Sequence, residues 1–213
     1  MKVLIAGSES QIGEVFDYNK SNIQIFKLTK KQLDITNLDQ SLEALKQIKP
    51  NVIINTAAFT DVDLAESEVD LAYKVNSIGP RNLAEICTYI NAYLIHFSTD
   101  YVFDGTKDKK YLEDDLVNPI SIYGKSKLKG ENNIIKNCDK YSIIRISWLY
   151  GQLKKNFVTQ IVNLIKKNVK LNVVNDQYSL PTNNLDLYNI LLIILNKIDQ
   201  GFRYFDGSRL AEL

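Results

Sequence analysis

Residues 2–13 read KVLIAGSESQIG, a short apolar run that passes directly into a glycine-containing turn. Apolar residues that continue without alternation, as Val3, Leu4 and Ile5 do, are typical of a strand buried on both faces of a parallel sheet. The turn leads into a helical pattern, and backbone N–H groups at such a helix start can hold a phosphate. This unit predicts the fold and suggests a nucleotide site.

Four further apolar runs follow, and helical patterns separate them. The runs cover residues 23–26, 52–55, 93–97 and 142–146. Residues 37–49 carry leucine and isoleucine at helical spacing, and residues 65–91 give a longer helical pattern that Gly79 and Pro80 should bend or break. Because strand–helix–strand crossovers are right-handed, we expect an α/β fold with a doubly wound parallel sheet, Rossmann-like, over residues 1–150.

The pattern changes after residue 150. We expect a helix over 157–168, a short strand over 171–174, a helix over 184–199 and a strand-like segment over 202–205. The apolar run in the second of these helices is too short and too interrupted to span a bilayer, so it predicts a buried helix. Residues 151–213 are therefore expected to form a small, partial substrate-binding lobe that packs on the first domain.

Composition excludes several classes of function. The chain has 26 Lys and Arg against 25 Asp and Glu, a balance that favours binding to neither nucleic acid nor an anionic membrane. Cys87 and Cys138 lie far apart without metal-ligand spacing, and with no leader the chain is expected in the reducing cytoplasm. The single histidine, His96, rules out two-histidine zinc motifs and is expected in the core, so we expect no metal site.

The glycine turn departs from the usual dinucleotide pattern. Ser10 stands where a glycine normally lets phosphate approach the backbone, and its Cβ should crowd that site. On this turn alone, dinucleotide binding and an ordinary strand-to-helix turn are equally supported. After the second strand, residues 26–31 read FKLTKK and lack an acid for a ribose hydroxyl, so their lysines favour NADPH over NADH, with a solvated basic loop as the alternative.

The pattern Tyr-x-x-x-Lys occurs twice, at Tyr123/Lys127 and at Tyr150/Lys154. A chance match is expected in a chain with 12 tyrosines and many lysines. Only the first pair follows a plausible helix start, at Ser121, which puts both side chains on one helix face. The ammonium should lower the pKa of the phenol toward the working pH, which would make Tyr123 a proton donor to a carbonyl oxygen.

A third polar group is expected at the same edge of the sheet. Thr99 follows the fourth strand, at the carboxyl end where ligands bind in doubly wound sheets, and its hydroxyl can fix a carbonyl oxygen. The alternative for Tyr123 and Lys127 is a packed aromatic ring beside a surface lysine. The residues together predict carbonyl reduction.

Four segments carry more information than their spacing alone: NTAAFTDVDLAE at 55–66, FSTDYVFDG at 97–105, SWLYG at 147–151 and NDQYSLPT at 175–182. Together they closely resemble the dTDP-4-dehydrorhamnose reductase family of extended short-chain dehydrogenases/reductases. The resemblance implies reduction of the 4-keto group of dTDP-4-dehydro-L-rhamnose to dTDP-L-rhamnose, for polysaccharide biosynthesis. It implies NADPH as the cofactor, with NADH as the alternative.

The resemblance also implies roles for individual residues. The catalytic group is Thr99, Tyr123 as general acid, and Lys127 as its partner and ribose anchor. The cofactor is implied to contact Gly7, Ser10, Gln11, Ile12, Gly13, Asp34, Ile35, Ala57, Ala58 and Thr60, besides Tyr123 and Lys127. The sugar is implied to contact Val62, Thr99, Asp100, Tyr101 and Trp148, since a sugar ring packs well on aromatic faces.

Two further expectations and two alternatives follow from the resemblance. The family usually continues past this C-terminus, so the second lobe is expected to be truncated and its cleft open. Expected partners are a nucleotide-sugar substrate and a second copy of the chain in a homodimer. A non-catalytic dinucleotide-binding subunit, similar to the regulatory subunit of methionine adenosyltransferase, is one alternative function. A nucleotide-sugar epimerase or dehydratase with tightly held NAD is the other.

Overall fold

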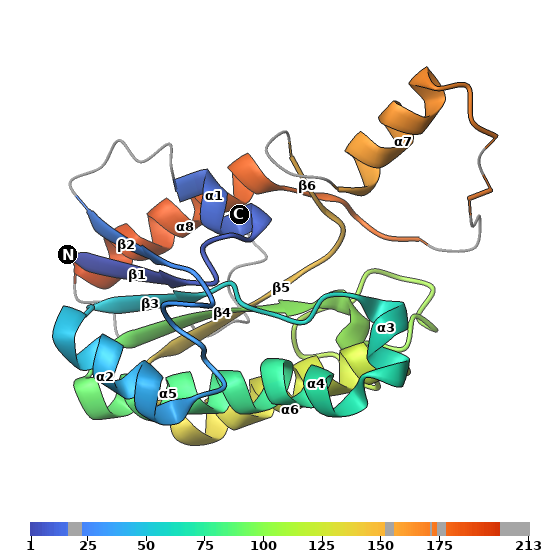
Figure 1. Ribbon diagram of the computed structural model, residues 1–213. Coiled ribbons are helices and arrows are strands. Elements are labelled where there is room, and N and C mark those ends of the chain that lie inside the picture. Colours follow the sequence, from blue (N-terminus) through green and yellow to red (C-terminus); the bar gives the residue numbers. More distant parts are fainter. Residues whose placement is uncertain (17–22, 152–155, 171, 174–177, 201–213) are drawn as a thin grey trace.

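Five parallel strands form the centre of the molecule. The computed structural model describes residues 1–16, 23–151, 156–170, 172–173 and 178–200. The strands are β1 (Lys2–Ala6), β2 (Gln24–Leu28), β3 (Val52–Asn55), β4 (Tyr93–Thr99) and β5 (Tyr141–Ile146), in the order β2-β1-β3-β4-β5 (Figure 1). The predicted doubly wound parallel sheet is confirmed, and the strand order reverses direction between β1 and β3.

Helices cover both faces of this sheet (Figure 1). One face carries α1 (Gln11–Val15) and α8 (Asn184–Asp199), and the other carries α2 (Leu38–Ile48), α5 (Gly79–Ile90) and α6 (Ile122–Asn137). Successive residues of each strand alternate between the two layers, because strand side chains have a period of two. Val3 and Ile5 pack toward α8, whereas Leu4 packs toward α5.

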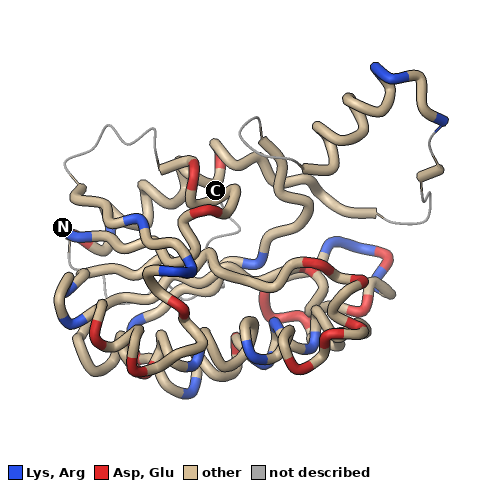
Figure 2. The backbone as a smooth tube through the Cα atoms, viewed as in Figure 1, with Lys and Arg blue, Asp and Glu red and all other residues tan. Residues whose placement is uncertain are grey.

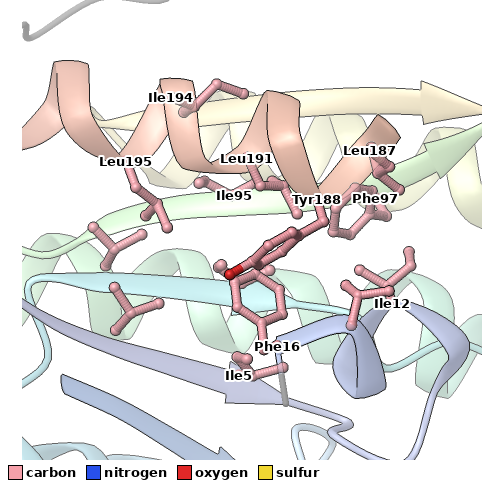
Figure 3. Close-up of a cluster of buried hydrophobic side chains, with 14 of the residues drawn as sticks. Ile5, Ile12, Phe16, Ile95, Phe97, Leu187, Tyr188, Leu191, Ile194 and Leu195 are labelled. Atoms are coloured by element: carbon pink, nitrogen blue, oxygen red, sulfur yellow. The ribbon is translucent and has the colours of Figure 1, made fainter. Parts of the chain in front are cut away.

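Helix α8 belongs to the same core as the strands, although it lies past residue 150. Leu187, Leu191, Ile194 and Leu195 are buried against strand residues, as Figure 3 shows. The ring of Tyr188 meets that of Phe16 edge to face, with 5.4 Å between the centroids. The predicted buried helix is confirmed, and the division of the chain at residue 150 stays a prediction.

The long helical pattern over 65–91 is several pieces in the structure. It comprises α3 (Val62–Ser67), α4 (Val69–Tyr73), the π-helical turn η2 (Lys74–Ile78) and α5. Pro80, in the first turn of α5, has no N–H to donate back into the preceding turn, so the backbone widens into η2 just before it. The predicted bend is therefore present, in the form of a π-turn.

The end of the chain contains less regular structure. It has the short parallel pair β6 (Leu149–Tyr150) and β7 (Thr182–Asn183), which the sequence patterns did not predict, and α7 (Phe157–Lys166), which they did. The strand expected at 171–174 is wrong for 172–173, which are not extended in a ladder, while 171, 174 and 202–205 lie outside the described residues. Over the described part of the chain, no helix is long and apolar enough to cross a bilayer.

Positions of Lys and Arg and of Asp and Glu are spread along the described backbone, as Figure 2 shows.

Two buried thiols come together from distant points of the sequence. Cys87 on α5 and Cys138 after α6 lie in one core cluster and share a hydrogen bond, and the adjacent Thr88 hydroxyl donates to the Asn137 carbonyl oxygen at 2.9 Å. These contacts join the C-terminal ends of α5 and α6.

We expect Leu191→Ala to lower the free energy of unfolding by about 2–5 kcal/mol, because the side chain is fully buried between α8 and the sheet. Urea unfolding followed by circular dichroism measures this. The control is Ile193→Ala on the same helix, where the side chain is 44% exposed and the loss should stay below about 1 kcal/mol. Equal losses would show that α8 is not held by the sheet in this way.

Candidate active site

A cleft of about 900 Å³ lies at the carboxyl ends of β1, β3 and β4, beside the point where the strand order reverses. This is where ligands bind in doubly wound sheets. The structure brings nearly all the predicted site residues to its walls: Gly7, Ser10, Gln11, Ile12, Asp34, Ile35, Ala57, Ala58, Thr60, Val62, Thr99, Asp100, Tyr101, Tyr123, Lys127 and Trp148. Gly13 does not line the cleft and lies beneath the turn instead.

The glycines of the first turn are required by the backbone. Gly7 has φ +78°, and a Cβ there would lie 2.7 Å from the Ala57 backbone. A Cβ on Gly13 would lie 2.4 Å from the Ser8 carbonyl oxygen, so Gly13 allows α1 to start close under the turn. Both glycines therefore shape the cleft wall through close backbone packing.

Ser10, in place of the middle glycine, is used within the turn. Its hydroxyl oxygen accepts a hydrogen bond from the Gly13 N–H at 2.9 Å as the N-cap of α1. The same hydroxyl donates to Thr56 Oγ1 at 2.8 Å, and Thr56 in turn donates to the Ala6 carbonyl oxygen. The Ser10 hydroxyl therefore ties the turn to the end of β3.

The start of α6 presents Tyr123 and Lys127 to the cleft, as their spacing predicted. Ser121 caps the helix by accepting from the Gly124 N–H at 3.1 Å. Gly124 lets the helix approach the preceding 3-10 turn η3 (Asp100–Val102), since a Cβ there would lie 2.2 Å from the Tyr101 carbonyl oxygen. The Tyr101 and Tyr123 rings meet edge to face with centroids 5.6 Å apart.

The pKa of Tyr123 is raised, to about 12, so the expectation of a lowered value is wrong. Burial is the main cause, with smaller contributions from Asp100 and Tyr101, while a hydrogen bond with Thr99 acts in the opposite direction. At neutral pH the phenol therefore keeps its proton. Thr99 also accepts from the Tyr101 N–H at 3.2 Å and donates to Asp100 Oδ1 at 3.1 Å.

Lys127 is buried, and its ammonium donates to the Phe97 carbonyl oxygen at 2.5 Å. Burial lowers the pKa of this ammonium to about 8, and the Glu131 carboxylate partly counters that effect.

His96, expected in the core, is fully buried and accepts a hydrogen bond from Asn55 Nδ2 at 3.0 Å. Burial and the Lys127 charge hold the pKa of His96 well below its usual value, so the ring is neutral.

Two aromatic side chains, Trp148 and Phe157, also line the cleft. Trp148 has a left-handed backbone, φ +44°, and its ring meets that of Phe157 edge to face at 4.9 Å. A left-handed backbone at a tryptophan is uncommon and strained, and such strain often marks a binding surface.

Asp100 Oδ2 accepts a hydrogen bond from the Ser179 hydroxyl at 3.2 Å, which links η3 to the segment before β7. Burial raises the pKa of Asp100.

Sequence reasoning missed several residues that line the cleft. They are Phe59, Leu71, Val75, Ile146 and Phe157. Leu71 and Val75 could not be found, because apolar residues in a helical pattern look like ordinary core residues. Phe157 carried a weak signal, since it begins a helix shortly after Trp148.

Among the described residues, no three His, Cys, Asp or Glu side chains lie together as metal ligands would.

An extended short-chain dehydrogenase/reductase has this sheet order, a cleft at the switch point, and a threonine, a tyrosine and a lysine on its wall, as Thr99, Tyr123 and Lys127 are here. A family model described as "RmlD substrate binding domain" matches residues 1–207. The chain belongs to this family, that of the dTDP-4-dehydrorhamnose reductases.

Three relatives show how close the similarity is. The dTDP-4-dehydrorhamnose reductase of Aggregatibacter actinomycetemcomitans is 41% identical over 203 residues, covering 94% of this chain and 69% of that protein. The crystal structure of a Clostridium acetobutylicum dTDP-4-dehydrorhamnose reductase superposes with a TM-score of 0.89 at 42% identity, covering 92% of this chain and 71% of that one. The Bacillus anthracis enzyme, solved in complex with NADP, gives 0.88 at 40% identity, covering 92% and 70%.

We expect the stability difference between the protein and its Lys127→Met variant to change with pH. The folded-state pKa of Lys127 is about 8 against an ordinary value of 10.5, so between these two pH values the unfolded chain binds more protons than the folded one. As the pH rises from about 8 to about 10.5, the free energy of unfolding of the unaltered protein should therefore increase relative to that of the variant, by up to about 3 kcal/mol.

Urea unfolding at pH 7, 8.5 and about 10 measures this difference. Lys125→Met is the control, because Lys125 is exposed on the same helix and its replacement changes no buried charge. A stability difference for Lys127→Met that stays flat over this pH range would contradict the burial of a titrating ammonium.

Proposed function

We propose that this chain reduces the 4-keto group of dTDP-4-dehydro-L-rhamnose with NADPH, giving dTDP-L-rhamnose in the cytoplasm. The observation that carries the proposal is the convergence of Thr99, Tyr123 and Lys127 in the cleft that the first turn also lines. The relatives are named for this substrate, and one of their structures holds NADP. The chain spans about two thirds of the relatives' length.

The cleft fits a dinucleotide. Gly7 brings the backbone close to the cleft without a side chain, and the Oε1 atom of Gln11 is buried there with no hydrogen-bond partner among the described residues. Asp34, Ile35 and Lys30 also line the cleft, and Lys30 lies close enough to Asp34 to lower its pKa. We propose that the turn holds the pyrophosphate, that Asp34 and Ile35 border the adenine, and that Lys30 pairs with a 2′-phosphate.

When bound, the reduced nicotinamide supplies a hydride to the carbonyl carbon of the sugar. Tyr123 holds its proton at neutral pH and donates it to the carbonyl oxygen. The Thr99 hydroxyl orients that oxygen. The Lys127 ammonium, behind the phenol on the same helix, stabilises the phenolate that forms.

The sugar side of the cleft is proposed to use Val62, Asp100, Tyr101 and Trp148, all of which line it. The Trp148 and Phe157 rings offer apolar faces against which a deoxysugar can pack. We propose that residues 151–213 contribute a partial substrate lobe, with α8 serving the core of residues 1–150. We also propose that two copies of the chain form a homodimer.

We expect Tyr123→Phe to lower kcat by about 10²–10⁴-fold, because the variant loses the proton donor. NADPH affinity should stay nearly unchanged. The loss of NADPH absorbance with enzymatically generated dTDP-4-dehydrorhamnose measures kcat, and a fluorescence titration measures binding. The control is Tyr150→Phe, which alters the other Tyr-x-x-x-Lys match and lies outside the cleft lining, so full activity is expected.

Two results would overturn this proposal. Full activity of Tyr123→Phe would remove the phenol from the mechanism. NADPH binding by the unaltered protein without any turnover would favour the alternative of a non-catalytic dinucleotide-binding subunit.

We expect Lys30→Ala to weaken NADPH binding about tenfold while leaving NADH binding unchanged, since only NADPH carries the phosphate that the ammonium would meet. The comparison of the two cofactors in one titration measures this effect. Lys31→Ala is the matched control, because Lys31 is exposed and does not line the cleft. Equal weakening of NADPH and NADH would show that Lys30 does not recognise the phosphate.

A further inference from the structure

Keeping a positive charge on Lys127 is a physical problem for this site. The side chain is 2% exposed, and its ammonium donates a hydrogen bond to a neutral acceptor, the Phe97 carbonyl oxygen. Taking an ammonium out of water favours its neutral form. The proposed role of Lys127 nevertheless requires the charged form, so a compensating charge is needed nearby.

Glu131 is placed to supply that charge. It lies four residues after Lys127 on α6, and both side chains are buried, so they are neighbours on the helix face that packs against β4 and β5. The Glu131 carboxylate raises the pKa of Lys127 against the effect of burial. It is itself 2% exposed, and a carboxylate that deep in the protein needs strong partners.

Arg145 on β5 is that partner. Its Nε lies 3.0 Å from Glu131 Oε1 and its Nη2 lies 2.7 Å from Oε2, a two-bond arrangement that fixes the orientation of the carboxylate. Arg145 is held in turn by the Glu113 carbonyl oxygen, which accepts from Nη1 at 3.2 Å, and by the Phe103 ring, 5.1 Å from the guanidinium. The carboxylate position is therefore set from β5 and from the loop after η3.

The other groups that face Lys127 do not offer a comparable charge. On β4, His96 is neutral. From η2, Asn76 presents an amide that donates to Ser126 Oγ at 3.0 Å. On η3, Asp100 is engaged by Thr99 and Ser179, and it acts on Tyr123.

The charged groups of the remaining helices lie at the ends or on the surface. On α3, Glu66 accepts from the Ile122 N–H at 2.8 Å, at the very start of α6. On α5, Arg81 and Glu85 form a pair that is exposed on both sides. The Glu131 carboxylate is thus the buried negative charge nearest to Lys127 along its own helix face.

We propose that Glu131, fixed by Arg145, is a positioning residue that keeps the Lys127 ammonium charged in its buried place. The Arg145–Glu131 pair is in this view part of the electrostatics of the site as well as a link between α6 and β5. This inference rests on the proposed function, because the charge of Lys127 matters for the stabilisation of the Tyr123 phenolate.

The test compares the pH dependence of kcat for Glu131→Gln, Arg145→Gln and the unaltered protein. Glu131→Gln removes the negative charge and leaves the Arg145 cation, so the alkaline fall in activity should move down by about one pH unit. Arg145→Gln leaves Glu131 with Lys127 as its nearest cation, so the fall should move up. Glu85→Gln, in the exposed Arg81–Glu85 pair, is the matched control and should not move it.

Opposite shifts support the proposal, because a merely structural pair would lower stability in both variants without moving the pH profile. An unchanged alkaline limit in both variants, or a shift in the same direction, would overturn it. If a glutamine variant does not fold by circular dichroism, Glu131→Asp replaces it. That variant keeps the charge but withdraws it by one methylene, and a smaller downward shift is expected.

The pH dependence of NADPH affinity, measured on the same proteins, separates this inference from the proposed function. A protein that binds NADPH but does not turn over the sugar would disprove the function. In that case, a pH limit of NADPH binding that moves downward in Glu131→Gln would still support the proposal, and an unchanged limit would overturn it.

Discussion

The contact between the Lys127 ammonium and the Phe97 carbonyl oxygen is the constraint on which the site depends. It holds α6 against the end of β4, and this brings Tyr123 beside Thr99. Gly124 permits the approach, because a side chain at that position would collide with the Tyr101 carbonyl oxygen. The contact places a charge away from water, which lowers the stability of the fold. The charge serves the proposed reaction at Tyr123 instead.

Much of the architecture follows from local patterns in the sequence. The apolar runs of β1 and β3 have no alternation, and the helix at 184–199 matches the predicted residues. Nearly every residue that the family resemblance assigned lines a single cleft. The short pair β6 and β7 was missed, because two-residue strands have too few side chains to give a period.

What the sequence does not contain is the environment of each group. The Tyr123–Lys127 spacing suggests an acidic phenol, but burial dominates in the folded protein, so the pKa of Tyr123 rises. Ser10 looks like a defect in the turn, yet its hydroxyl joins the N-terminus of α1 to Thr56. The contact between Cys87 and Cys138 likewise depends on how α5 and α6 end, which no spacing records.

The wall of the cleft that carries Phe157 differs in kind from the wall that carries Tyr123. Within the described chain, α7 has no buried side chain, and Phe157, Val158, Val162 and Ile165 all remain exposed. Exposed apolar side chains stabilise a helix less than buried ones do, so the amides of α7 should exchange with solvent faster than those of the fully buried strand β4. Fixing exposed side chains on such a wall costs conformational entropy, which reduces the affinity that a ligand gains by packing on Phe157.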